Sequence, residues 1–284
     1  MRAHVAFNRR TSAAYRHLGI VAAGFPPAFG PGQFVMVRPP FSVDPLLPRA
    51  FSIYRITPPA DGTGPTVEIL YKVLGKGTQC LSRMEDGQEV EILGPLGNSF
   101  TLQDRVDTAV LVAGGIGVPP IAALAAALGR DRGSGTRDQG GVGEPPTPNP
   151  QPSRLAAFLG GKTSEDILCV KDFEEVSATL HVATEDGSAG TRGLITDVLE
   201  PFLRTSDLGP LTMFTCGPPG MLAAVARLAE QHGIPCQTAV EANMACGFGA
   251  CMGCAIEARS NGPGPTYKLV CKDGPVFDSR ELVW

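Results

Sequence analysis

Four cysteines near the C-terminus have the spacing of a metal-binding site. Cys246, Cys251 and Cys254 follow the pattern C-x4-C-x2-C, and Cys271 lies further along the chain. This is the plant-type spacing of a [2Fe–2S] centre, in which four thiolates hold two irons. The glycines between the first three cysteines would allow a tight loop that turns its N–H groups toward the sulfurs. The pattern therefore predicts an iron–sulfur site.

Zinc is the alternative metal, because four cysteines in a tetrahedral array can also bind it. The usual zinc pattern has two C-x2-C pairs, however, and here only Cys251 and Cys254 form one. The spacing favours iron–sulfur over zinc. The remaining cysteines have no ligand spacing and are expected to be buried thiols: Cys80, Cys169, Cys216 and Cys236.

Two segments in the first third of the chain are weaker candidates for a nucleotide site. Arg49-Ala-Phe-Ser52 would by itself be an ordinary exposed strand. Gly75-Lys-Gly77-Thr78 follows a predicted strand. The N–H groups of such a turn can hold a diphosphate, although a plain hairpin turn fits these residues equally well.

Two glycine-rich turns later in the chain have the context of dinucleotide-binding loops. Gly114-Gly-Ile-Gly117 lies between an apolar strand and a helix, so its backbone could approach a pyrophosphate. It departs from G-x-G-x-x-G because Pro120 stands in place of the third glycine, and a ligand-free turn is the alternative. Cys216-Gly-Pro-Pro-Gly220 also joins a strand to a helix, where a single cysteine is more often a core residue.

The distribution of apolar segments predicts an α+β multidomain fold in three parts. Residues 1–105 contain short strands separated by Gly and Pro, which is typical of a small antiparallel β-barrel. Residues 106–240 alternate strands and helices, as in a Rossmann-like, doubly wound α/β domain, with one helix expected to end before Pro201. Residues 241–284 hold the four cysteines, and residues 130–153 predict a flexible, polar surface insertion.

Composition excludes several classes of function. The net charge is −4 and the pI is near 5.6, which leaves no basic surface for nucleic acid. Neither a membrane-spanning apolar run nor a signal peptide is present, so we expect no membrane attachment. Because half of the eight cysteines form one cluster, the chain does not resemble a secreted disulfide scaffold, and a reducing cytoplasm is expected.

Together these motifs resemble those of a known family. A barrel with RAFS and GKGT precedes an α/β domain with GGIGVPP and CGPPGM, and then MACGFGACMGC and CKDGPVF. The combination resembles the electron-transfer subunits of class 1B, NAD-dependent dihydroorotate dehydrogenases, in the ferredoxin–NADP reductase superfamily. The likeness covers nearly the whole chain apart from 130–153, and the cysteine segment is its most specific part.

The resemblance implies ligands for each redox group. Arg49 would contact the FAD phosphates and Ser52 the flavin ring, with Phe51 where many relatives have a stacking tyrosine. Further FAD contacts would be Ala50, Leu70, Tyr71, Lys72, Gly77 and Thr78. The nicotinamide nucleotide would contact Gly114, Gly115, Gly117, Cys216, Gly217 and Pro218. The cluster ligands would be Cys246, Cys251, Cys254 and Cys271, and no catalytic acid or base is implied.

The function implied by the resemblance is electron transfer in pyrimidine biosynthesis. Electrons would leave dihydroorotate at FMN in a separate catalytic subunit, cross the [2Fe–2S] cluster singly, reach FAD and pass as hydride to NAD+. A flavin must stand between cluster and nicotinamide because it exchanges both single electrons and hydride. The FMN-containing partner would complete a heterotetramer with two copies of each subunit.

Other functions fit parts of the same pattern. They are the small subunit of a ferredoxin:NAD(P) oxidoreductase or hydrogenase-type complex, a stand-alone flavin reductase and a zinc-stabilised interaction module.

The preference for NAD over NADP depends on Glu185 and Asp186, which follow a predicted strand and would repel a 2′-phosphate. A solvated turn is the alternative role for these two acids.

Overall fold

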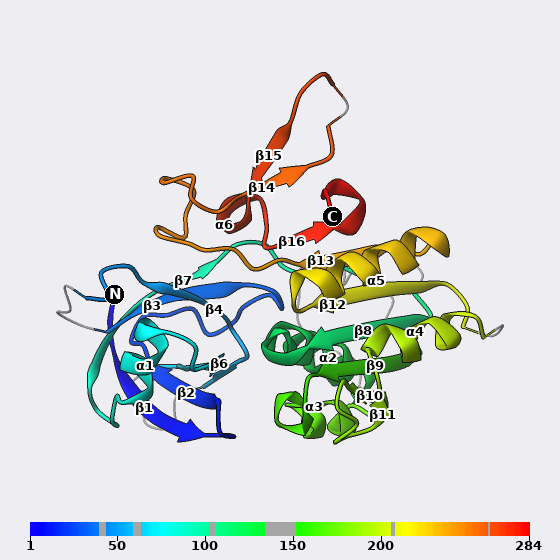
Figure 1. The fold of residues 1–284 in the computed structure, drawn as a ribbon. Coiled ribbons are helices and arrows are strands. Elements are labelled where there is room, and N and C mark those ends of the chain that lie inside the picture. The colour runs from blue at the N-terminus through cyan, green and yellow to red at the C-terminus, as the bar shows by residue number, and fades with distance from the viewer. Residues whose placement is uncertain (40–43, 59–63, 103–105, 134–151, 206–207, 261) are drawn as a thin grey trace, which may run out of the picture.

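The computed structural model consists of a barrel, an α/β domain beside it and a small C-terminal subdomain above both (Figure 1). It describes residues 1–39, 44–58, 64–102, 106–133, 152–205, 208–260 and 262–284. Among these residues, no helix is both long and apolar enough to cross a membrane.

Seven antiparallel strands form the barrel, in the order β4-β3-β7-β1-β2-β6-β5. The chain between the two edge strands closes it, because the Ile53 N–H donates to Gln33 O and the Tyr54 N–H donates to Glu68 O, each at 2.9 Å. The elements are β1 (Arg2–Arg10), β2 (Tyr15–Val21), β3 (Phe34–Arg38), β4 (Arg49–Ser52), β5 (Arg55–Thr57), β6 (Thr66–Lys72), α1 (Lys76–Ser82) and β7 (Glu89–Leu96).

Helix α1 was not expected from the sequence. Gly75 is its N-cap, and the Thr78 hydroxyl accepts hydrogen bonds from the N–H groups of Leu74 at 3.0 Å and Gly75 at 3.1 Å. The hairpin alternative for Gly75–Thr78 is therefore wrong. This helix is short and has no long amphipathic repeat, so only the capping threonine marks it locally.

The α/β domain contains a parallel sheet in the order β11-β10-β9-β8-β12-β13, extended by the antiparallel strand β16. Its elements are β8 (Thr108–Gly114), η1 (Gly115–Gly117), α2 (Val118–Gly133), β9 (Arg154–Gly161), η2 (Ser164–Asp166), α3 (Val170–Glu175), β10 (Thr179–Thr184), β11 (Thr191–Arg192), α4 (Ile195–Leu203), β12 (Leu211–Cys216), α5 (Pro219–Gln231) and β13 (Cys236–Ala239).

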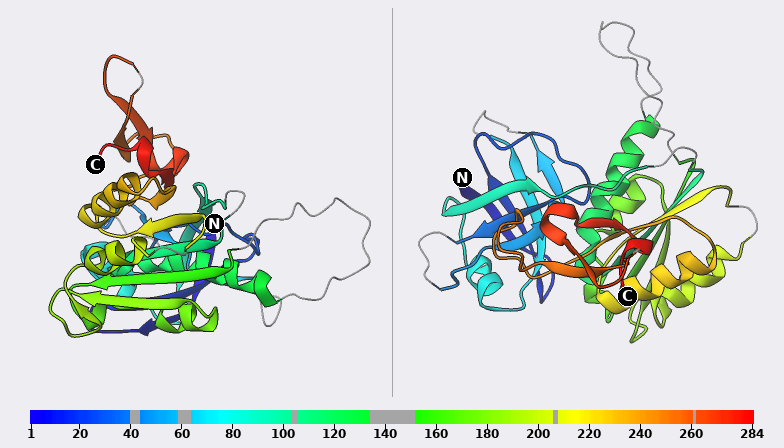
Figure 2. Two further views of the ribbon diagram at one scale, coloured as in Figure 1. Left: turned by 90° about the vertical axis from the view of Figure 1, so that its right-hand side faces the viewer. Right: turned by 90° about the horizontal axis from the view of Figure 1, so that it is seen from above.

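Helices cover both faces of this sheet (Figure 2). Every residue of the central strand β8 is buried. Ala109 and Leu111 pack with α2 and α3, whereas Val110 and Val112 pack with α4 and α5. The doubly wound α/β architecture predicted for this part is confirmed. Of the predicted insertion 130–153, residues 130–133 form the last turn of α2, and 134–151 lie outside the described residues.

Helix α4 continues past Pro201, which was expected to end it. Ile195, Leu199 and Leu203 are all buried on the face that packs against the sheet. An interior proline costs about 3 kcal/mol. Burying each large aliphatic side chain contributes about 1.5–3 kcal/mol, so packing outweighs the proline.

The C-terminal subdomain is built from the hairpin β14 (Ala255–Ala258) and β15 (Thr266–Leu269), followed by α6 (Val270–Asp273), β16 (Val276–Asp278) and η3 (Ser279–Glu281). The hairpin projects from the body of the molecule (Figures 1 and 2). Because β16 pairs with β13, the C-terminal segment also completes the sheet of the α/β domain.

Candidate redox site

The four clustered cysteines form two pairs. The sulfurs of Cys254 and Cys271 are 3.2 Å apart, and Cys246 and Cys251 also contact each other. Among the described residues, no group of three Cys, His, Asp or Glu side chains is arranged to hold a single metal ion. Two thiol pairs fit a two-iron cluster, with two thiolates per iron, better than one tetrahedral zinc.

Backbone N–H groups point at these sulfurs, as the glycine-rich loop predicts. The Gly253 N–H donates to the Cys251 sulfur at 3.5 Å, and the Cys271 N–H donates to the Cys254 sulfur at 3.4 Å. N–H groups of Phe248 and Cys251 lower the pKa of the Cys246 thiol to about 6. Such N–H···S bonds stabilise thiolates and the negative charge of a bound cluster.

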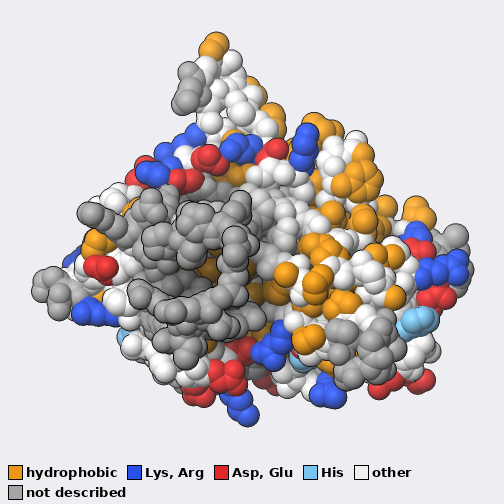
Figure 3. Space-filling model, turned by 180° about the vertical axis from the view of Figure 1, so that it is seen from behind, with side chains coloured by type: hydrophobic (Ala, Val, Ile, Leu, Met, Phe, Trp, Pro, Cys, Tyr) orange, Lys and Arg blue, Asp and Glu red, His pale blue; other side chains and the backbone are white. Residues whose placement is uncertain are grey.

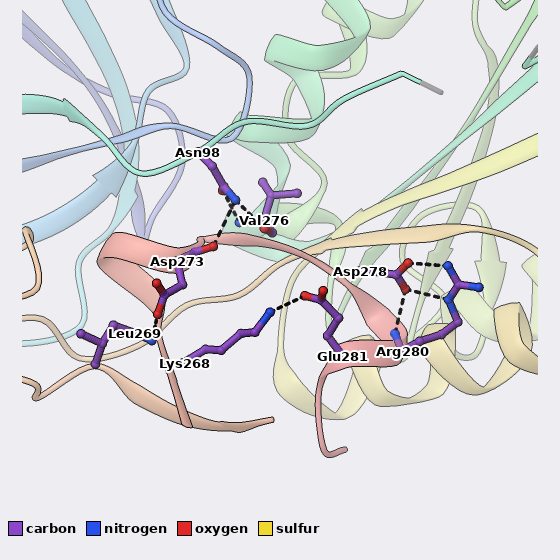
Figure 4. A network of polar contacts seen from close by, with 8 residues as sticks. All are labelled: Asn98, Lys268, Leu269, Asp273, Val276, Asp278, Arg280 and Glu281. Carbon is purple, nitrogen blue, oxygen red and sulfur yellow. Dashed lines mark hydrogen bonds and ion pairs between the residues drawn. The ribbon is translucent and has the colours of Figure 1, made fainter. Parts of the chain in front are cut away.

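The barrel braces the turn that carries Cys271 through Asn98, which follows β7 (Figure 4). The Asn98 amide nitrogen donates to Val276 O at 2.8 Å and Asp273 O at 3.3 Å, and its oxygen accepts the Val276 N–H at 2.9 Å. The Asp273 carboxylate accepts the Leu269 N–H at 2.7 Å, which fixes the start of α6. Helix α6, which carries the fourth cysteine, is therefore braced by a residue from outside the C-terminal subdomain.

The buried cysteine pair shares one hydrophobic core with the barrel. Cys254 and Cys271 pack in a cluster that includes Met36 on β3 and Ala50 on β4. Ala50 belongs to the RAFS strand. The predicted flavin strand and the predicted cluster ligands, about 200 positions apart in the chain, are thus in one packed unit.

RAFS and GKGT lie next to each other, as a shared diphosphate site requires. A Cβ on Gly77 would lie 2.8 Å from Arg49 Nε, so only glycine leaves room for the guanidinium at the start of α1. The Arg49 side chain also donates to Leu47 O at 2.7 Å. A cation beside a helix N-terminus suits a diphosphate. Three exposed leucines precede these two segments in the chain: Leu46, Leu47 and Leu74.

Two of the predicted FAD residues point into the barrel. Phe51 and Tyr71 pack with the barrel core, and their rings meet edge to face at 5.7 Å. Lys72 directs its ammonium group away, to Asp166 of the α/β domain at 3.1 Å. Ser52 is half-buried, and Leu70 is buried.

The predicted nucleotide loops meet where the strand order of the sheet reverses. Strands β9 and β10 lie to one side of β8, and β12 and β13 lie to the other. In doubly wound sheets ligands bind at the carboxyl ends of strands at such a switch point. Gly114–Gly117 begins at the last residue of β8 and Cys216–Gly220 begins at the last residue of β12, so both border this position.

The two loops touch backbone to backbone. A Cβ on Gly117 would be 2.5 Å from Cys216 O, and a Cβ on Gly217 would be 3.0 Å from Gly114 N. Pro218 contacts the same place, 2.8 Å from the Cβ position of Gly114. Cys216 itself turns its thiol into the core, where burial raises its pKa well above the usual value. Only its backbone faces the loops.

The two acids expected to select NAD follow β10, two strands away from β8. The Glu185 N–H donates to Gly161 O at 3.1 Å, which places this turn beside the loop after β9. The Asp186 carboxylate accepts the Ser188 N–H at 2.9 Å and therefore caps its own turn. Asp186 is therefore part of an exposed turn.

Two exposed apolar side chains lie on the cluster loop itself. Phe248 is 59% exposed and Met252 is 61% exposed, on either side of the exposed Cys251. Met252 has φ 59°, a backbone conformation that non-glycine residues rarely adopt. Seen from behind, hydrophobic side chains also gather over the centre and the barrel side of the molecule (Figure 3). The cluster loop thus offers an apolar surface beside its most exposed ligand.

Sequence reasoning missed several residues at the domain contacts. Asn98, Tyr15 and Asp166 carry no motif, and each acts on a partner more than 100 positions away. Among their local features, only the acidic N3 position of Asp166 in a Thr163-capped turn is readable from sequence.

Comparison with known proteins agrees with this geometry. Residues 241–283 match the family described as the iron-sulfur cluster binding domain of dihydroorotate dehydrogenase B, and residues 111–227 match the oxidoreductase NAD-binding domain. The chain has the fold of an NADH-dependent reduced ferredoxin-NADP oxidoreductase involved in electron bifurcation, with TM-score 0.78 and 23% identity over 99% of this chain and 90% of that one. A ferredoxin NADP+ reductase from Neisseria gonorrhoeae has TM-score 0.61 at 15% identity, covering 82% and 91%.

Curated relatives are more similar in sequence. The dihydroorotate dehydrogenase B (NAD(+)) electron transfer subunit of Bacillus caldolyticus is 37% identical over 89% of this chain and 86% of the relative. That of Caldanaerobacter subterraneus subsp. tengcongensis is 33% identical over 100% and 98%. With its barrel, nucleotide loops and paired cysteines in one arrangement, the chain belongs to the family of electron-transfer subunits of NAD-dependent dihydroorotate dehydrogenase B.

Proposed function

We propose that this chain carries electrons from dihydroorotate oxidation, performed by a separate catalytic subunit, to NAD+ in pyrimidine biosynthesis. The observation that carries the proposal is the shared core of Cys254, Cys271 and Ala50. Two of the cysteines that would hold the two-iron cluster thus pack against the strand that would hold the flavin. Electron transfer requires redox sites that lie close together. A zinc-stabilised interaction module does not require its metal site to pack against a flavin strand.

The chain supplies positions and charges rather than a catalytic acid or base. When bound, FAD exchanges single electrons with an iron–sulfur cluster and hydride with a nicotinamide. Arg49, beside the N-terminus of α1, would neutralise the FAD diphosphate, with Gly77 and Thr78 completing that turn. The glycine loops after β8 and β12 would admit the nicotinamide nucleotide close to their backbone. Cys246, Cys251, Cys254 and Cys271 would hold the cluster.

We assign three functional units to the chain on the same basis. Residues 1–105 would bind FAD, residues 106–240 would bind NAD, and residues 241–284 would bind the cluster. Strand β16 belongs to the third unit in sequence but pairs with the second, which supports a fixed relation between them. All eight cysteines are free thiols, in keeping with a reducing cytoplasm.

The partner would be an FMN-containing dihydroorotate-oxidising subunit, assembled as two copies of each chain. An electron can leave the cluster only if another redox centre lies nearby. Phe248 and Met252 provide an apolar docking surface around the exposed Cys251, which supports docking at this loop.

Anaerobic purification of the full chain tests the proposal. We expect iron and sulfide at two each per chain, one FAD, little zinc, and reduction of the flavin by NADH in preference to NADPH. Affinity purification from the native cell should recover a subunit that oxidises dihydroorotate. Zinc without flavin absorption would contradict the electron-transfer role. Recovery of a hydrogenase or ferredoxin-dependent subunit would contradict the proposed partner and favour one of the alternative complexes.

A further inference from the structure

One carboxylate ties the barrel to the α/β domain. Asp166 Oδ1 accepts the Tyr15 hydroxyl at 2.5 Å and the Lys72 ammonium at 3.1 Å. Its Oδ2 accepts the N–H groups of Lys162 at 3.0 Å and Thr163 at 3.3 Å. The carboxylate therefore fixes its own loop with one oxygen and holds two barrel strands with the other.

These contacts lie beside the nucleotide turn. The loop of Asp166 follows β9, and Gly160 near the end of β9 pairs with Gly114 at the end of β8. A Cβ on Gly115 would find the Tyr15 hydroxyl as its nearest neighbour, at 3.7 Å. The Tyr15–Asp166 bond is therefore adjacent to the turn that would receive the nicotinamide nucleotide.

The same contacts reach the flavin side through β6. Tyr15 on β2 pairs with Lys72 on β6, and the Lys72 ammonium lies 4.9 Å from the Tyr15 ring centroid. Lys72 ends the strand that contains Leu70 and leads toward α1. One hydrogen-bonded group thus connects the strand bordering the flavin position to the loops bordering the nicotinamide position.

The group is rigid. Tyr15 is 2% exposed and packs in the hydrophobic core of the α/β domain, although it belongs to the barrel. The side chain of Asp166 is 11% exposed. A carboxylate at that depth requires its partners, because an unpaired buried charge is costly. Gly161 leaves the necessary space, since its Cβ would lie 2.7 Å from the Asp166 Cβ.

A second contact has the same chemistry in a different place. Asp172 on α3 accepts the Tyr54 hydroxyl at 2.6 Å and Arg55 at 2.9 Å. Tyr54 also packs against the α/β core. Tyr15, and neither Tyr54 nor Asp172, is the side chain found nearest to the Cβ position of Gly115. This second contact joins the same two domains through a different helix, α3, and so it is a matched control.

We infer that Tyr15, Lys72 and Asp166 are positioning residues for hydride transfer between nicotinamide and flavin. The inference rests on the proposed function. The step moves one hydride, two electrons with one proton, from NADH to FAD or in reverse, and a second proton exchanges with solvent. Its rate depends on sub-ångström placement of the two rings, because misplacement by about 1 Å can cost about 100-fold. These three residues set that placement from both sides.

The test compares Tyr15→Phe with Tyr54→Phe in the full chain carrying FAD and cluster. Each variant keeps the ring and removes one hydroxyl that binds an aspartate. Anaerobic stopped-flow mixing with NADH gives both the rate of flavin reduction at saturation and the apparent Kd for NADH. We expect Tyr15→Phe to lower the saturating rate by roughly tenfold with little change in Kd. Tyr54→Phe should leave the rate near that of the wild type.

Lys72 provides a second, independent variant pair. Lys72→Met should slow flavin reduction, and Lys72→Arg should restore most of the rate because it keeps a cation within reach of Asp166. Thermal unfolding with bound FAD checks that each variant is folded. Equal slowing by Tyr15→Phe and Tyr54→Phe, or no slowing by Tyr15→Phe and Lys72→Met, would overturn the inference. Failure of NADH to reduce the wild-type flavin would instead overturn the proposed function.

Discussion

Gly247, directly after the first cluster cysteine, lies against the side chain of Met36 on barrel strand β3. A Cβ at position 247 would be 2.5 Å from Met36 Cγ, and its φ of +83° also favours glycine. The cluster loop is therefore docked onto the barrel by a contact that tolerates no side chain. This contact explains why Cys246 holds its place although it lies outside the buried cysteine pair.

Gly247→Ala should loosen the cluster without unfolding the protein. A left-handed backbone costs alanine about 1 kcal/mol, and overpacking adds about 1–3 kcal/mol. We expect lower iron and sulfide content and faster bleaching of the cluster absorption in air, with FAD content unchanged. Gly253→Ala is the control, because its Cβ would meet only the Cys251 sulfur, at an ordinary 3.6 Å. Equal cluster loss in both variants would contradict this explanation.

Cys271→Ser should remove or destabilise the cluster. Burial and the neighbouring Cys254 raise the pKa of the Cys271 thiol to about 12, so a bound metal must displace that proton, and a serine hydroxyl resists this even more. Bound FAD and its reduction by NADH should persist. Cys236→Ser changes another buried thiol that has no cysteine neighbour and should keep a full complement of iron. A normal cluster spectrum in Cys271→Ser would mean that the fourth ligand is assigned wrongly.

Gly77→Ala should lower the affinity for FAD. The added methyl group would press on the Arg49 guanidinium, 2.8 Å from its Nε, and displace it from the start of α1. Loss of a charge-assisted contact to phosphate corresponds to about 1.5–3 kcal/mol, or roughly tenfold to 100-fold in Kd. Titration of the apoprotein with FAD, followed by flavin fluorescence, measures it. Ser82→Ala, in the last turn of the same helix, should bind FAD nearly as the wild type does.

Charged substitutions on the cluster loop should weaken docking of the catalytic subunit. Phe248→Asp and Met252→Asp each place a carboxylate on an exposed apolar site beside Cys251. If this surface is the centre of the interface, the Kd for the partner should rise by about 30-fold or more. Reduction of the flavin by NADH should be unchanged. Leu194→Asp, at a site 57% exposed on the α/β domain, should bind the partner normally. Unaltered binding by both loop variants would place the interface elsewhere.

The Asp166 contact should make stability depend on acid pH. Burial by itself would raise the pKa of Asp166, but hydrogen bonds from Tyr15 and Lys72 bring it below its usual value. The stabilisation is therefore complete above the unfolded-state pKa of about 3.9 and is lost as pH falls through the lower folded-state value. The Tm of the wild type should fall more steeply as the pH is lowered than the Tm of Asp166→Asn. Parallel curves would rule out this coupling.

The same group should also act at high pH. Burial and the bond to Asp166 raise the pKa of Tyr15 to about 12, and the Tyr15 bond raises the pKa of Lys72. The unfolded-state pKa values of both groups are about 10. Their contribution to stability is therefore complete below about pH 10 and decreases as the pH rises further. Tyr15→Phe should show a shallower alkaline loss of stability than the wild type.

The sequence by itself determined the family, the fold class and the chemistry of the metal site. Cysteine spacing, the glycine turns after strands and the buried run of β8 are local signals, because ligand loops and strand periodicity are encoded within a few residues. They were sufficient to expect a barrel, a doubly wound domain and an iron–sulfur subdomain. The comparisons confirm that expectation.

Tertiary structure alone decided how these parts are joined. The bond of Asn98 to Val276, the contact of Gly247 with Met36 and the Tyr15–Asp166 bond each link positions far apart in the chain. Pro201 inside α4 is a similar case, since burial against a distant sheet overrides a local rule. Such contacts depend on which surfaces the folded domains bring together, and no periodicity or spacing in a single sequence records that.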